Sequence, residues 1–150
     1  MIEFIDAKCP GMKYVDIASG CGFSKSFIYN LRARRSDSHQ MRVVIKFMYG
    51  LSGLLSEDVE DLFVEYILGS VLGEYPDVSF GSICDWLVYY KGGETFKDLS
   101  DRIGLDQGRM TAWIHHGSSP SDTVLRWVLI ALDGSSEEQC RSFFRVAIGR

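Results

Sequence analysis

The sequence predicts an all-α protein of two tandem units with about five helices each, spanning residues 1–74 and 75–150. No stretch alternates apolar and polar residues as a strand would, and apolar residues recur at helical spacing. The second half of the chain also repeats the pattern of the first. With Gly22 placed over Gly104 the offset is 82 residues, and Tyr14 then lies over Phe96. We interpret this pattern as an internal duplication.

The first three helices of each unit follow from this alignment. The third helix is expected to begin after Ser24 in the first unit and after Asp106 in the second, because both are good N-cap residues. The first two helices are expected at residues 2–8 and 14–20 in the first unit, and at 80–90 and 96–102 in the second.

Two further helices complete each unit. In the second unit, the fourth helix is expected to start with Ser119 as its N-cap and Pro120 at its first helical position. The fifth helices open at "SED" (56–58) and "SEE" (136–138). Between the units, the glycine and proline of segment 73–77 break the helical pattern.

Several side chains have an expected environment. Cys21, Trp86, Trp113 and Trp127 are expected to be buried in the core. The fifth helix of the first unit is expected to be amphipathic, because its apolar residues recur at helical spacing. Its acidic outer face would consist of Glu57, Asp58, Glu60, Asp61 and Glu65.

The final helix carries an apolar stripe. Its members are Cys140, Phe143, Phe144, Ala147 and Ile148. Such a helix either caps its own unit or pairs with a second chain. The matching helix of the first unit (59–67) can pack against the second unit, but no later unit follows to cover this stripe, so we favour a homodimer joined through the C-terminal unit.

Charge is unevenly distributed along the chain. The overall net charge of -4 argues against a protein that coats DNA nonspecifically, but residues 1–50 hold eight basic and four acidic residues. Three of these bases, Arg32, Arg34 and Arg35, come soon after Gly22. They form either a solvated helix end or a surface that meets phosphate. Residues 51–100 have a net charge of -8, and residues 101–150 are neutral.

The segments around the two glycines share one local design. Ala18 and Ser100 are small residues where two short helices would cross, and glycine readily adopts the left-handed backbone of a turn. Apolar residues follow six and nine positions after each glycine, at Ile28 and Leu31 and again at Met110 and Trp113. This spacing resembles the helix-turn-helix of the lambda-repressor-like (Cro/C1-type) family. The resemblance implies a sequence-specific, DNA-binding transcription regulator of phage or mobile-element type.

In that family, the second helix of the motif lies in the major groove of double-stranded DNA. By position, the resemblance implies DNA contacts by Ser24, Lys25, Ser26, Tyr29 and Asn30, with Ala33 beside them. Lysine can bind guanine acceptors and asparagine can pair with adenine, whereas Arg32, Arg34 and Arg35 would hold phosphates. Partial packing of Tyr29 against the protein is an equally good interpretation.

The second motif is the weaker candidate for DNA binding. The resemblance implies contacts by Gln107, Arg109 and Thr111, with Gly108, Ala112 and His115 nearby. Asp106 departs from the pattern, because phosphate repels a carboxylate. We therefore expect the first motif to be the main reader of DNA, and the second to be an auxiliary reader or a dimerisation scaffold.

A second class of function is also open. The chain could be a protein-binding module that keeps the helix-turn-helix fold and uses its acidic and apolar faces. Within the first class, occlusion of a promoter and recruitment of RNA polymerase are both consistent with the sequence.

Other classes find no support in the sequence. No window approaches the roughly 20 apolar residues of a membrane span, and the start does not resemble a secretory signal. The four cysteines are scattered, which favours reduced thiols in a cytoplasmic protein. His115 and His116 are interpreted as a polar helix end, and no nucleophile motif accompanies them. We expect no catalytic residues, metal or cofactor.

Overall fold

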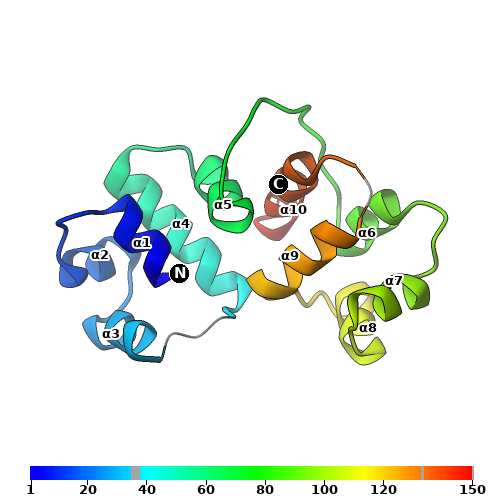
Figure 1. Ribbon diagram of the computed structural model, residues 1–150, viewed down its shortest axis with the longest axis horizontal. Coiled ribbons are helices and arrows are strands. Elements are labelled where there is room, and N and C mark those ends of the chain that lie inside the picture. Colours follow the sequence, from blue (N-terminus) through cyan, green and yellow to red (C-terminus); the bar gives the residue numbers. More distant parts are fainter. Residues whose placement is uncertain (35–37, 133, 150) are drawn as a thin grey trace.

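The computed structural model describes residues 1–34, 38–132 and 134–149, and over these ranges the chain forms ten helices and no strand (Figure 1). The all-α prediction is confirmed. The first half contains α1 (Ile2–Lys8), α2 (Tyr14–Cys21), α3 (Lys25–Arg34), α4 (Met41–Leu55) and α5 (Val59–Leu68). The second half contains α6 (Ile83–Lys91), α7 (Phe96–Ile103), α8 (Gln107–His115), α9 (Asp122–Ala131) and α10 (Ser136–Ala147).

The helices of the two halves correspond in order. The bounds of α2 and α7 differ by the same 82 residues as Gly22 and Gly104, and α3 and α8 begin at the same offset. Segment 69–82 joins α5 to α6 and contains the expected boundary at residue 74 (Figure 1). The helices of both halves contribute to one continuous hydrophobic core.

The first unit depends on a close approach of α2 to α4. A Cβ atom built at Gly50 would lie 2.4 Å from both the Cα and the Sγ of Cys21. Glycine at this position therefore lets the two helix backbones approach closely. Cys21 is 4% exposed, which confirms its expected burial.

Two predictions about α9 are wrong: the position of its first residue and the burial of Trp127. It begins at Asp122, and the Ser121 side chain caps it by accepting a hydrogen bond from Val124 N, so the expected start at Ser119 and Pro120 is wrong. The Asp122 N–H, which has no partner within the helix, donates to the His39 carbonyl at 3.1 Å. A tertiary contact therefore helps to fix where the helix starts.

The expected burial of Trp127 is the second of these predictions. Trp86 and Trp113 are buried, but Trp127 is 49% exposed, because α9 packs through the opposite face that contains the buried Leu125 and Leu129.

Helices α5 and α10 form the junction between the two halves. The Phe63 and Phe144 rings lie 4.8 Å apart, and Cys140, Phe143 and Phe144 are fully buried. The expectation that the final helix lacks a cover within its own chain is therefore wrong, because α5, α6 and α9 pack around it. The homodimer stays a prediction, but it loses this argument.

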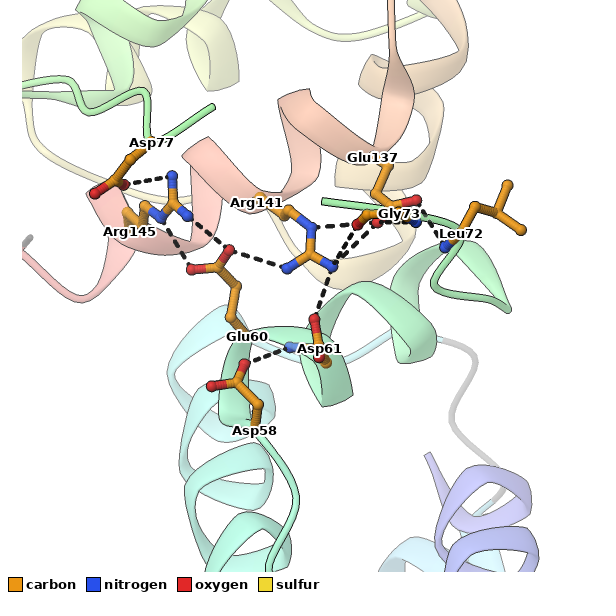
Figure 2. A network of polar contacts seen from close by, with 9 residues as sticks. All are labelled: Asp58, Glu60, Asp61, Leu72, Gly73, Asp77, Glu137, Arg141 and Arg145. Atoms are coloured by element: carbon orange, nitrogen blue, oxygen red, sulfur yellow. Dashed lines mark hydrogen bonds and ion pairs between the residues drawn. The ribbon is translucent and has the colours of Figure 1, made fainter. Parts of the chain in front are cut away.

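An ion network surrounds this junction. Figure 2 shows Arg141 at its centre, with guanidinium nitrogens 3.1 Å from Glu60, 2.7 Å from Asp61 and 3.0 Å from Glu137. Arg145 pairs with Glu60 as well, at 2.9 Å. The expected acidic outer face of α5 thus needs correction, because two of its carboxylates face α10.

Both ends of the network reach the connecting segment. Arg145 pairs with Asp77 at 2.7 Å, and Glu137 accepts hydrogen bonds from the N–H groups of Leu72 and Gly73 (Figure 2). Burial alone would raise the pKa of Glu137, but these N–H groups and Arg141 hold it below its usual range. The network therefore joins the connecting segment to the junction of α5 and α10.

A second polar cluster joins the halves at the N-terminus of α9. The buried Asp122 carboxylate accepts hydrogen bonds from the backbone N–H of His39 at 2.7 Å and from the Tyr66 hydroxyl. His39 Nδ1 lies 3.1 Å from the same carboxylate, and Arg126 lies over the Tyr66 ring. Burial would raise the pKa of Asp122, but these hydrogen bonds hold it well below its ordinary value.

The close helix contact predicts the effect of adding one methyl group to α4. Gly50→Ala should lower the free energy of unfolding by about 1–3 kcal/mol, because the Cβ overlaps the α2 backbone. Gly53→Ala in the same helix is the matched control, since no atom lies within 4 Å of its Cβ position. It should stabilise the protein by about 0.5–1 kcal/mol. Urea unfolding measures both, and equal effects would contradict the close approach.

The Asp122 cluster predicts a dependence of stability on pH. Because the folded pKa lies below the unfolded value of about 3.9, the carboxylate stabilises the fold above that value. This contribution is lost as the pH falls from about 5 through 4 and below. Asp122→Asn should therefore show a shallower loss of stability between pH 5 and 3 than the unsubstituted protein, measured by urea unfolding. The exposed Asp101→Asn is the control, and a slope unchanged in Asp122→Asn would contradict this role.

Candidate nucleic-acid interface

The two glycine turns have the same backbone geometry. Gly22 and Gly104 have φ values of +69° and +76°, both in the left-handed region. Phe23 N donates to the Ala18 carbonyl at 2.8 Å, and the equivalent bond from Leu105 N to the Ser100 carbonyl is 2.9 Å. Ala18 and Ser100 are buried, as predicted, so the helices cross at these small residues.

The second helix of each motif is fixed by a cap and by apolar contacts. Ser24 Oγ accepts a hydrogen bond from Phe27 N at 3.2 Å, and Asp106 Oδ1 accepts one from Gly108 N at 2.6 Å. Both predicted N-caps are therefore confirmed. The core-facing residues are buried at Ile28, Met110 and Trp113 and half-buried at Leu31.

The predicted contact residues of the first motif lie together on α3 and its N-cap. We call this exposed set the α3 surface. It consists of Ser24, Lys25, Ser26, Tyr29, Asn30 and Arg32. Arg34 ends α3, but its side chain lies outside the described part of the structure, as does the whole of Arg35.

Tyr29 is both packed and exposed. Its ring meets Tyr14 edge to face at 6.0 Å, while 43% of the residue stays exposed. Lys25 Nζ lies 5.7 Å from the Tyr29 ring centroid, and the Arg32 guanidinium lies 5.3 Å from that of Tyr14. The two cations are thus held beside aromatic rings at the protein surface.

The cations of the α3 surface remain available for an external anion. Within the described part of the chain, neither Lys25 nor Arg32 forms an ion pair with a carboxylate. Arg102, Arg126, Arg141 and Arg145 in the second half all pair with acidic side chains.

Lys46 and Tyr14 support the α3 surface in ways that the sequence did not predict. Lys46 of α4 donates to the Gly22 carbonyl at 2.7 Å and lies over the Phe23 ring, so it adds positive charge at the turn. The Tyr14 hydroxyl donates to Asp6 at 2.5 Å, and this hydrogen bond raises the pKa of Tyr14. The spacing of Arg42 and Lys46, four residues apart on α4, was the one local signal for Lys46.

The second motif presents a different surface. Gln107, Arg109 and Thr111 are exposed on α8, as the resemblance implies. Beside them lies a recess of about 220 Å³. Its lining comprises Phe96, Lys97, Ser100, Gln107, Met110, Thr111 and Ile114.

The alignment explains why this recess is open. Thr111 and Ile114 take the positions of Tyr29 and Arg32, whose side chains contact Tyr14 in the first motif. The smaller and uncharged side chains leave the space between α7 and α8 unfilled. The two motifs therefore share a backbone design and differ in surface chemistry.

Metal binding and thiol chemistry find no support among the described residues. No group of three or more His, Cys, Asp and Glu side chains there could hold a metal ion. Burial raises the pKa of Cys21 to about 11 and also raises that of Cys140, so these thiols stay protonated at neutral pH. Within the same ranges, no helix has the length and apolar character needed to cross a membrane.

No protein family, curated protein or solved structure matches the chain.

Asp106 can affect stability in two ways, through the hydrogen bond by which it caps α8 and through its negative charge. Asp106→Ala should lower the free energy of unfolding by about 1 kcal/mol, because it removes the acceptor for Gly108 N. Asp106→Asn should leave stability nearly unchanged, because asparagine caps about as well and only the charge is lost. Thermal unfolding of the two variants tests this, and equal destabilisation would show that the charge, not the cap, matters.

Proposed function

We propose that the protein is a sequence-specific transcription regulator that binds double-stranded DNA, with α3 as its main recognition helix. The observation that carries the proposal is the set of exposed, unpaired cations on and around a helix that follows a glycine turn. Phosphate neutralisation by such cations supplies much of the affinity of a protein for DNA.

The side chains between these cations are suited to base contacts. Asn30 presents both a donor and an acceptor, and Lys25 presents donors that match guanine O6 and N7. Ser24 and Ser26 are small and exposed beside them. A helix with this surface combines phosphate-positioning and base-reading groups.

The overall acidity of the chain is compatible with this role. Lys8 pairs with Glu57 and Glu65, and Arg141 pairs with Glu60 and Asp61. These carboxylates are therefore engaged within the protein instead of forming a free acidic face. This weakens the alternative of a protein-binding module that uses that face.

Exposed apolar residues still support the alternative of a protein-binding module. On α9, Trp127 is 49% exposed and Ile130 is 82% exposed, and both could contact a protein partner. Repression and activation also differ in their need for a protein partner, because only activation requires RNA polymerase.

The main test distinguishes base contacts from phosphate contacts on the α3 surface. Duplexes selected from a random library provide the binding site. On the selected duplex, Lys25→Ala and Asn30→Ala should each weaken binding by about 1–3 kcal/mol and relax the preference at one base position. Arg32→Ala should weaken all sequences alike and reduce the slope of log affinity against log salt by about one. Fluorescence anisotropy at several salt concentrations measures both effects.

A charge-matched pair of variants provides the control. Arg32→Glu should abolish binding at physiological salt, whereas Lys91→Glu at the end of α6 should leave affinity within about twofold. Circular dichroism confirms that both variants stay folded. Equal loss in the two variants would indicate a nonspecific effect of net charge, and failure to select any duplex would favour the protein-binding alternative.

A further inference from the structure

The equivalent helices of the two halves pack against each other. α5 and α10 are the fifth helices of their units, and they meet at Phe63 and Phe144, whose ring centroids are 4.8 Å apart. Two identical chains related by a two-fold axis would make the same kind of contact, with one helix meeting its own copy. Here the contact lies within a single chain.

Polar contacts hold this junction in one arrangement. Arg141 donates to three carboxylates from α5 and α10 and is only 11% exposed at its side chain (Figure 2). The Asp122 cluster adds a second link, because His39 lies in the segment between α3 and α4 while Asp122 begins α9. The orientation of one motif relative to the other is therefore fixed by contacts far apart in the sequence.

The junction places both motifs on one side of the molecule. In the view down the shortest axis, α3 and α8 lie at opposite ends of the lower edge, and the C-terminus and the connecting segment lie above (Figure 1). Helix-turn-helix dimers read two half-sites about 34 Å apart by presenting two recognition helices on one edge.

We propose that a single chain acts as its own dimer: α3 and α8 enter two successive major grooves of one duplex, and the two half-sites are unlike. This inference rests on the proposed function. It replaces the expected homodimer, because the surface of α10 that would join two chains is already buried against α5.

The unlike half-sites follow from the side chains at equivalent positions. Lys25 corresponds to Gln107, Tyr29 to Thr111, and Arg32 to Ile114. The first surface is cationic and aromatic, whereas the second is neutral at these positions and borders an open recess. Two such surfaces cannot prefer the same bases, so the preferred site is not a palindrome.

The experiment uses the full chain and 35-bp duplexes selected from a random library. We expect two enriched sequence blocks of different composition, with centres about 10 bp apart, and one chain per duplex by native mass spectrometry. Inserting 5 bp between the blocks turns the second block to the opposite side of the duplex. This insertion should lower affinity roughly 100-fold, because the second contact is then lost.

Two exposed variants assign the blocks to the motifs. Gln107→Ala combined with Arg109→Ala should relax preference only in the second block, and Lys25→Ala only in the first. One enriched block with no effect of spacing would overturn the inference and leave α3 as the sole reader. A palindromic site with two chains per duplex would also overturn it, in favour of a homodimer. If no duplex is enriched at all, the proposed function itself fails, and that outcome is distinct from both.

Discussion

The contact between α5 and α10 is the constraint on which the rest of the structure depends. Each half ends in a helix with a large apolar face, and α5 and α10 bury part of these faces against each other. Arg141 lies beside this contact with Glu60, Asp61 and Glu137. Burying these charges has a desolvation cost, and removing one partner would leave the others unpaired. We infer that the network mainly selects one register of the two helices, and that this register sets the separation of α3 and α8.

The sequence was most informative where structure is determined locally. The left-handed conformation of Gly22 and Gly104, the caps at Ser24 and Asp106, and the burial of Ala18 follow from rules that act within about ten residues. The resemblance to the helix-turn-helix family, carried over by position, placed Lys25, Asn30 and Arg32 on a contact surface, and all three are exposed. The alignment of the two halves also predicted the order of the helices, although it could not predict how the halves pack.

The failures of prediction share a physical cause. The pairing of Glu60 with Arg141 spans 81 residues, and no local pattern distinguishes a solvated acidic face from one that meets arginines of another helix. The start of α9 was misplaced for a similar reason, since the Asp122 cluster holds that position through His39 and Tyr66. Trp127 was expected in the core, but the burial of a side chain on α9 depends on which neighbouring helices cover it.

The same long-range contacts explain how an acidic protein can present a cationic surface. The carboxylates of α5 are neutralised by Lys8, Arg141 and Arg145. Two further arginines of the second half, Arg102 and Arg126, also pair with carboxylates inside the fold. Among the described residues of α3 and α4, the exposed bases Lys25, Arg32, Arg42 and Lys46 have no carboxylate partner and stay at the surface. The stability of the fold and the proposed contact with DNA thus depend on different basic residues. The boundary near residue 74 divides a sequence pattern, not two independent folding units, because either half alone would expose Phe63 or Phe144 and leave the charges around Arg141 without their partners.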